Sequence, residues 1–207
     1  MSQFFSLHPA NPQPRLVRKA AEIIRNGGVI AYPTDSCYGL GCHIGDKTAL
    51  DRLRRIRGID ETHHLTLMCR DLSEIGAFAK LDNANFRLLK RLTPGSYTFI
   101  LQATREVPRR LLHSKRKTIG IRVPDHCIAQ ALLAELGEPL LSATMSLPGD
   151  EAPLAGAGEI RERLEHQLDL VIDGGPCGTE PTTVIDLTSG VPVLLRAGRG
   201  ALEPFGF

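Results

Sequence analysis

Short β-prone runs alternate with amphipathic helical stretches along this chain of 207 residues, and this alternation limits the folds available to it. Two of the runs stop at a proline: residues 29–32 precede Pro33, and residues 118–123 precede Pro124. Proline cannot donate to a strand ladder, so such runs are typical of strands that lead into loops. Strands that alternate with helices predict an α/β fold, in which helices pack on the sheet.

The same patterns predict the other elements from apolar spacing and from the residues that begin or end helices. Asp46 is expected to cap a helix that runs to Arg57, and Gly137 is expected to end another. We expect helices at 14–26, 47–57, 71–78, 82–92, 126–136 and 159–167, and strands at 29–32, 65–69, 97–103, 118–123, 139–145, 168–172, 182–187 and 191–196. The closely spaced strands near the end of the sequence indicate a mixed sheet.

The composition excludes several classes of protein. With 42% apolar and 23% charged residues, the chain is neither disordered nor a coiled coil. No run approaches 18 consecutive apolar residues, and the first residues lack the pattern of a secretory signal, so we expect a cytoplasmic protein without a membrane span. Five cysteines are an odd number in a chain long enough to fold without disulfides, which favours reduced thiols.

The formal net charge of +2 conceals an uneven distribution. Residues 52–57 carry +4 and residues 105–117 carry +5, so the rest of the chain sums to −7. Clustered Lys and Arg neutralise phosphates, and the 5% aromatic content favours structured or double-stranded RNA over single strands. The residues that would contact RNA are Arg109, Arg110, Lys115, Arg116 and Lys117. The alternative is a solvated polar face, which the helix at 47–57 needs in any case.

The loop after the first predicted run, PTDSCYGLG at 33–41, is the strongest local signal for a site. Loops at the carboxyl ends of strands deliver side chains to the crevice of an α/β sheet. The hydroxyls of Thr34 and Ser36 and the glycine amides could bind a small polar ligand. The alternative is a structural turn formed by threonine and aspartate, with glycines supporting it.

Two further segments place polar residues where strands begin or end. Arg122 alternates with apolar neighbours inside a predicted strand, which favours a side chain that points into a cleft. Thr182 and Thr183 open a later strand, either as simple β-formers or as hydroxyls that bind phosphate.

The sequence lacks the usual signatures of covalent, metal or phosphate-loop chemistry. Cys37 lies beside Asp35, but nothing supplies the ordered base that a nucleophile needs. The histidines and cysteines within 42–69 have no recognised ligand spacing, so we expect no tightly bound metal. With no Walker or GxGxxG pattern, arginines are the candidates for holding a nucleotide.

Seven segments taken together resemble the YrdC/YciO family, and especially its YciO branch. In the family's order they are PTDSCYGLG (33–41), TPGSYTFIL (93–101), KTIGIRVPDH (117–126), LLSATMSLPG (140–149), DLVIDGG (169–175), TTVIDLT (182–188) and LLRAGRG (194–200). The resemblance implies a single α/β domain over residues 1–207, with a core from about 14 to 200. It also implies a twisted, open sheet of parallel and antiparallel strands, flanked by helices, with a concave basic cleft.

The resemblance also implies a reaction. Catalytic members of the family form L-threonylcarbamoyl-AMP and pyrophosphate from L-threonine, bicarbonate and ATP, for the threonylcarbamoyladenosine modification of tRNA. The chain is accordingly expected to be a nucleotidyltransferase, with Mg²⁺ carried by ATP and with tRNA-modification proteins as partners. Such a reaction requires positioning and charge neutralisation rather than a covalent intermediate. The alternative is a paralogue that binds tRNA or double-stranded RNA with little or no catalytic activity.

Individual roles follow from the resemblance by motif position. Thr34, Arg122 and Thr182 would bind threonine, with Arg122 on its carboxylate. The nucleotide would contact Arg57, Thr118, Ser142 and Arg196, and catalysis is assigned to Arg55 and Arg57, which occupy the family's Lys-x-Arg element. Arg55 replaces a lysine, Thr144 replaces an asparagine, and residues 58–64 replace a proline-rich continuation. These departures lie at the nucleotide end, so weak activity is expected.

Overall fold

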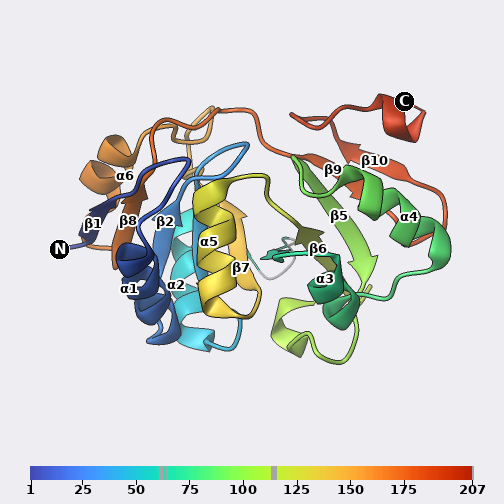
Figure 1. Ribbon diagram of the computed structural model, residues 1–207, viewed down its shortest axis with the longest axis horizontal. Coiled ribbons are helices and arrows are strands. Elements are labelled where there is room, and N and C mark those ends of the chain that lie inside the picture. Colours follow the sequence, from blue (N-terminus) through green and yellow to red (C-terminus); the bar gives the residue numbers. More distant parts are fainter. Residues whose placement is uncertain (61–62, 64, 113–115, 207) are drawn as a thin grey trace.

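The computed structural model describes residues 1–60, 63, 65–112 and 116–206, in which ten strands form one strongly twisted sheet (Figure 1). The strands are β1 (Gln3–Ser6), β2 (Ile30–Tyr32), β3 (Gly39–His43), β4 (Thr66–Met68), β5 (Tyr97–Gln102), β6 (Thr118–Arg122), β7 (Leu140–Thr144), β8 (Leu170–Asp173), β9 (Thr183–Asp186) and β10 (Val193–Arg196). The α-helices are α1 (Pro14–Arg25), α2 (Lys47–Arg57), α3 (Leu72–Phe78), α4 (Asn83–Leu92), α5 (Cys127–Leu136) and α6 (Ala157–Leu164), and there are short 3₁₀ turns at Arg109–Leu111 and Glu203–Phe205.

The strand order is β1-β8-β2-β3-β7-β4-β6-β5-β9-β10. Strand β8 runs parallel to β1 and β2, and the pairs β4/β6 and β5/β9 are also parallel, whereas the other neighbours are antiparallel. The predicted single α/β domain with a mixed, helix-flanked sheet is therefore confirmed. In the described part of the chain, no helix combines the length and the apolar character that crossing a bilayer requires.

The predicted helices and eight of the strands are present, but two strands were missed. Strand β1 lies ahead of residue 14 and pairs with β8, which is far away in the sequence, so no local pattern reveals it. Strand β3 contains Gly39 and Gly41, and glycine in a strand interior is unfavourable, so the sequence suggested a loop there. The capping predictions hold: Asp46 accepts a hydrogen bond from the amide of Ala49 at the start of α2.

The two glycines of β3 make room for the ring of Tyr32 on the neighbouring strand. A Cβ atom at Gly41 would lie 2.9 Å from Tyr32 Cε1 and 2.7 Å from Leu140 Cδ2, and one at Gly39 would lie 3.1 Å from the ring. The Tyr32 hydroxyl thereby reaches the Ser142 hydroxyl at 2.7 Å. Burial raises the pKa of Tyr32 to about 12, so the phenol stays protonated at neutral pH.

Alternate residues of the strands pack on opposite faces of the sheet. On one face, Leu67, Phe99, Leu141 and Ile185 join a core that also holds side chains of α2, α3, α4 and α6. On the other face, strand residues such as Ile30, Leu140 and Leu170 pack against α1 and α5, which lie side by side in Figure 1. Farther along this second face, the strands carry hydroxyl side chains instead of apolar ones, and the floor of a pocket forms there.

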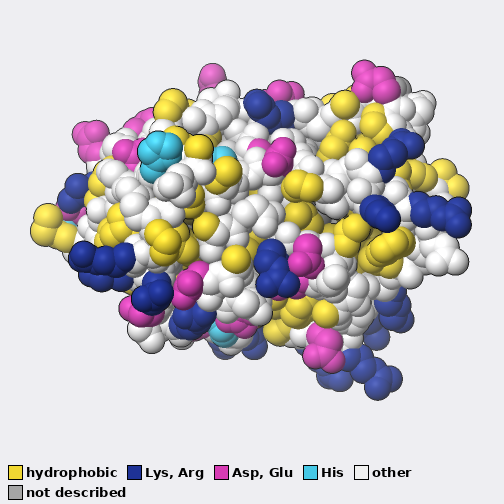
Figure 2. All heavy atoms as spheres, viewed as in Figure 1, with side chains coloured by type: hydrophobic (Ala, Val, Ile, Leu, Met, Phe, Trp, Pro, Cys, Tyr) yellow, Lys and Arg dark blue, Asp and Glu magenta, His cyan; other side chains and the backbone are white. Residues whose placement is uncertain are grey.

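The basic window at 52–57 is largely used for internal contacts. Arg52 forms an ion pair with Asp169 at 2.9 Å, and Arg54 donates to the carbonyl of Arg110 at 3.3 Å, whereas Arg55 is exposed. The basic face of α2 is therefore only partly exposed to solvent, in contrast to the fully solvated face that the sequence allowed. Figure 2 shows Lys and Arg interspersed with Asp and Glu over most of the visible surface, rather than one continuous basic field.

The close approach at Gly41 yields a prediction about stability. We expect Gly41→Ala to destabilise the protein by about 1–3 kcal/mol, because its methyl group would overlap Leu140 and Tyr32. Chemical denaturation monitored by circular dichroism measures the change. The matched control is Gly76→Ala in α3, where nothing lies within 4 Å of the added atom and where alanine should stabilise the helix by about 0.5–1 kcal/mol. A Gly41→Ala protein as stable as the parent would refute the packing argument.

Candidate functional site

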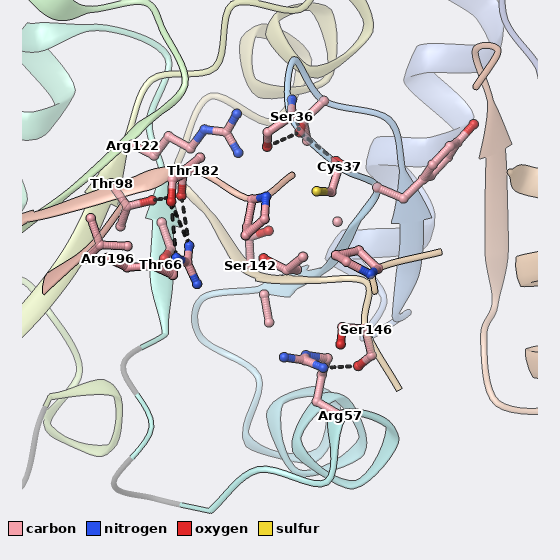
Figure 3. Close-up of a pocket in the computed structure, with 18 of the residues that line it drawn as sticks. Ser36, Cys37, Arg57, Thr66, Thr98, Arg122, Ser142, Ser146, Thr182 and Arg196 are labelled. Carbon is pink, nitrogen blue, oxygen red and sulfur yellow. Dashed lines mark hydrogen bonds between the residues drawn. The ribbon is translucent and has the colours of Figure 1, made fainter. Parts of the chain in front are cut away.

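A pocket of about 790 Å³ lies over the hydroxyl-bearing part of the sheet (Figure 3). Its floor comes from every second residue of neighbouring strands: Thr66 of β4, Thr98 of β5, Ser142 and Thr144 of β7, and Thr182 just ahead of β9. The walls come from the loop after β2, the end of α2 and the segment after β7. This volume is within the range of small-molecule sites.

The structure brings six of the predicted site residues together around this pocket. They are Thr34, Arg57, Arg122, Ser142, Thr182 and Arg196. Arg55 is exposed and does not line the pocket, because residues two apart on a helix are rotated by about 200° from each other. Thr118 is buried but also lies outside the lining, since it is four residues, or about 13 Å, from Arg122 along β6. For Arg55 and Thr118, the roles assigned by motif position therefore stay predictions.

Arg122 is the most buried charged group of the pocket, with 6% of its surface exposed. Its guanidinium forms an ion pair with Asp35, whose carboxylate also accepts hydrogen bonds from Ser96 Oγ at 2.6 Å and from the amide of Asp125 at 3.2 Å. Arg122 Nε is buried with no hydrogen-bond partner among the described residues. The prediction that Arg122 points into a cleft is confirmed, and Figure 3 shows it directed toward Ser36.

The loop after β2 fits both interpretations of its sequence. Thr34 Oγ1 donates to the carbonyl of Cys37 at 2.6 Å and accepts from the amide of Ser36 at 3.2 Å, so the threonine closes a turn. Thr34 and Ser36 also line the pocket. Because the Thr34 proton is used on Cys37, this hydroxyl can offer a ligand only its oxygen lone pairs.

On the opposite wall, Arg196 holds Thr182 in place. Its Nε and Nη2 donate to the Thr182 carbonyl at 3.2 and 2.9 Å, and Nη2 also lies 3.3 Å from the Thr182 hydroxyl. That hydroxyl is 2.8 Å from the hydroxyl of Thr98. Thr98 was not among the predicted site residues, although it is a lone polar residue inside the apolar run at 97–101.

The Arg57 end of the pocket lies across from Arg196 and Thr182 (Figure 3). Arg57 Nη1 donates to the carbonyl of Ser146, and its Nε is buried without a hydrogen-bond partner among the described residues. Burial, Arg57 and Arg196 together lower the pKa of His63, which therefore lines the pocket as a neutral side chain at pH 7. From the sequence, His63 was a candidate only for metal binding, and its place in the pocket was not predicted.

The charges and nucleophiles of the pocket define what it can do. Three arginines line it against two carboxylates, those of Asp60 and Glu151, so its lining is net positive. Burial raises the pKa of the Cys37 thiol to about 11, which leaves it a poor nucleophile at neutral pH. The described residues contain no group of three or more His, Cys, Asp or Glu side chains placed to hold a metal. The arrangement suits binding and alignment of anionic, hydroxyl-bearing ligands.

The residues predicted to bind RNA lie away from the pocket. Arg109, Arg110, Arg116 and Lys117 are exposed and outside its lining, and Lys115 lies outside the described residues. Arg110 donates to the carbonyls of Ile44 and Gly45, which fixes this segment to the end of β3. Arg116 lies 3.8 Å from Asp186.

Known proteins resemble this chain in both sequence and structure. A Sua5/YciO/YrdC family model, described as "Telomere recombination", matches residues 22–198. The uncharacterized protein YciO of Escherichia coli (strain K12) is 59% identical over 205 residues, which are 99% of this chain and 100% of the relative. The crystal structure of E. coli YciO matches with a TM-score of 0.96 over 99% of this chain and 100% of that one.

More distant relatives have named activities. The threonylcarbamoyl-AMP synthase of Chromobacterium violaceum is 36% identical over 183 residues, which are 88% of this chain and 94% of the relative. The crystal structure of Pyrococcus abyssi Sua5 complexed with L-threonine matches with a TM-score of 0.87 at 30% identity. That match covers 95% of this chain but 58% of the longer Sua5 chain.

The burial of Cys37 yields a prediction about thiol reactivity. A pKa of about 11 leaves about one thiolate in a thousand at pH 8, whereas Cys127 is exposed. We expect iodoacetamide at pH 8 to label Cys127 of the folded protein long before Cys37, as read by peptide mass spectrometry. Cys127→Ser should remove the fast label and leave the slow ones. Equal labelling rates at the two cysteines would contradict the environment assigned to Cys37.

Proposed function

The chain belongs to the Sua5/YciO/YrdC family, and we propose that it forms L-threonylcarbamoyl-AMP and pyrophosphate from L-threonine, bicarbonate and ATP. The observation that carries the proposal is a single pocket with cationic side chains at both ends and hydroxyls between them. Such a pocket can align an amino-acid carboxylate and a triphosphate at the same time. A named threonylcarbamoyl-AMP synthase at 36% identity supplies further support.

Threonine would bind at the Arg122 end. Arg122 would hold the carboxylate, because it is buried, is oriented by Asp35, and has an Nε donor without a partner among the described residues. The hydroxyls of Thr34 and Thr182 would meet the polar groups of the amino acid. The existence of a Sua5 structure in complex with L-threonine is consistent with a small amino-acid site in this family.

ATP would bind toward Arg57, with Ser142 and Arg196 beside the nucleotide. Arg57 Nε, which has no hydrogen-bond partner in the described part of the chain, is a charged donor suited to a phosphate oxygen. Mg²⁺ brought by ATP would neutralise part of the triphosphate charge, and Asp60 and Glu151 offer the carboxylate oxygens that this ion prefers. Arg55 has no part in this arrangement, because it does not reach the pocket.

The chemistry then consists of two bond-forming steps. The threonine amine and bicarbonate give a carbamate and water, and a carbamate oxygen then attacks the α-phosphorus of ATP. The bond from the α-phosphorus to the bridging oxygen of the β-phosphate breaks, and pyrophosphate leaves with that electron pair. The arginines align the two anions and stabilise the charge that develops on the phosphoryl oxygens. The high pKa of Cys37 agrees with a reaction that forms no covalent enzyme intermediate. The product would pass to tRNA-modification proteins in the cytoplasm.

Pyrophosphate release tests this proposal directly. We expect release only when ATP, L-threonine and bicarbonate are all present, and a loss of at least about 100-fold in Arg122→Ala, because the carboxylate would lose its charged partner. Arg57→Ala should also lose activity, whereas the exposed Arg55→Ala should stay within about twofold of the parent.

The matched control for these variants is Arg18→Ala on the surface of α1, which should leave the rate unchanged. The Chromobacterium violaceum synthase, assayed in parallel, shows that the conditions support the reaction. Absence of threonine-dependent release under those conditions would refute the proposed activity.

The second candidate is binding of tRNA or double-stranded RNA. It is favoured by the exposed cations Arg109, Arg116 and Lys117, on a segment that Arg110 fixes to the body of the protein. Phosphates are bound by such clusters without any need for aromatic platforms. The two functions are compatible, because these cations lie outside the pocket.

Salt dependence tests the second candidate. We expect the affinity for a 20-base-pair RNA, measured by fluorescence anisotropy, to fall steeply with salt. Arg109→Glu with Arg116→Glu should weaken binding by about tenfold or more and flatten the salt slope. The double variant Arg15→Glu with Arg18→Glu on α1 makes the same charge change elsewhere and is the control. Equal losses in the two double variants would show that net charge, rather than this segment, governs binding.

A further inference from the structure

The segment between β7 and α6, residues 145–156, forms one wall of the pocket. Ser146, Glu151, Ala152 and Pro153 line it, and the Ser146 carbonyl accepts the hydrogen bond from Arg57 (Figure 3). The position of this segment therefore determines where the Arg57 guanidinium is held. We call it the β7–α6 loop.

Backbone hydrogen bonds fix the two ends of the β7–α6 loop. The amide of Ser146 donates to the Thr144 carbonyl at 2.9 Å, and the amide of Leu154 donates to the Met145 carbonyl at 2.9 Å. Between these points the chain turns at Gly149, which has a positive φ of 86°. The loop thus leaves and rejoins the body of the protein within a few residues.

The tip is joined to α6 by a two-pronged ion pair. Arg163 Nη1 and Nη2 each lie 2.9 Å from one carboxylate oxygen of Asp150. Two parallel hydrogen bonds of this kind fix the relative orientation of the guanidinium and the carboxylate as well as the distance between them. The same contact lowers the pKa of Asp150 and raises the pKa of Arg163, so both groups stay charged across the neutral range.

Helix α6 is a rigid support for this contact. Ile160 is fully buried and Leu164 is 3% exposed, both within the larger core. Arg163 projects from the same helix toward solvent, with 37% of its side chain exposed. An exposed ion pair contributes little to global stability. The effect of this ion pair is therefore local, and the segment that it joins to α6 is the one that lines the pocket.

We propose that the Arg163–Asp150 ion pair is a positioning clamp for the pocket. By holding the β7–α6 loop against α6, it keeps the Ser146 carbonyl and Arg57 aligned for a phosphate-bearing ligand. Arg163 touches no ligand and acts through the loop. The identity of that ligand as ATP rests on the proposed function, but the clamp itself rests only on the contacts described.

A charge swap tests the clamp. Isothermal titration of the full chain with ATP and with L-threonine would compare the parent with Arg163→Asp, Asp150→Arg and the double variant that exchanges the two charges. We expect Arg163→Asp to weaken ATP binding by about tenfold, or about 1.4 kcal/mol, with threonine binding within twofold. The double variant should restore most of the ATP affinity, with a small deficit because Glu159 lies 3.6 Å from Arg163.

The matched control is Arg18→Glu, which reverses a cation that lies 3.9 Å from Glu135, on α1 rather than α6. It should leave both affinities unchanged. An unaltered ATP affinity in Arg163→Asp would overturn the clamp. So would a loss that the charge swap does not repair, or an equal loss of threonine binding, which would indicate general destabilisation.

Hydrogen exchange separates failure of the clamp from failure of the proposed function. In protein without ligand, Arg163→Asp should accelerate amide exchange in residues 145–156, and the charge swap should reverse the change. Unchanged exchange would overturn the clamp whatever the protein binds. If the exchange behaves as expected but the parent binds no ATP, then the clamp stands and the proposed synthase activity is refuted.

Discussion

The ion pair between Arg122 and Asp35 is the contact around which the candidate site is arranged. A buried guanidinium needs a nearby opposite charge, and removing one partner of a buried pair typically costs about 3–5 kcal/mol. Asp35 belongs to the loop after β2 and also accepts hydrogen bonds from Ser96, ahead of β5, and from Asp125, after β6. Three segments that are distant in the sequence thereby meet at one carboxylate. The pocket wall at this end is consequently fixed by a charge requirement rather than by apolar packing alone.

The two faces of the sheet explain how a single layer of strands can be both a core and a binding floor. Because side chains alternate along a strand, Leu67, Phe99 and Leu141 enter the apolar core, while their neighbours Thr66 and Ser142 face the pocket. The absence of a side chain at Gly41 lets Tyr32 lie across β3 and hydrogen-bond Ser142 on the same face of the sheet. The floor is thus polar on its open side and is supported by close packing.

Local patterns predicted most of the fold, whereas tertiary arrangement decided the site. Caps such as Asp46 and breakers such as Pro33 act within a few residues, so the sequence displays them directly. Strand β1 and the pocket residue Thr98 depend on partners more than 80 residues away, and no local signal specifies those partners. Thr118 differs from both, since its role was assigned by motif position, it lies outside the pocket lining, and that role stays a prediction.

The three arginines that line the pocket use their hydrogen bonds in two different ways. This difference determines where the pocket carries net positive charge. Arg122 meets a carboxylate, which neutralises it and makes it a positioned donor. Arg57 and Arg196 instead donate to the backbone carbonyls of Ser146 and Thr182. A carbonyl satisfies the donor geometry but leaves the full positive charge in place. The net positive charge of the pocket is therefore carried by Arg57 and Arg196, which lie across the pocket from each other, whereas Asp35 balances the charge of Arg122 and orients its donors (Figure 3).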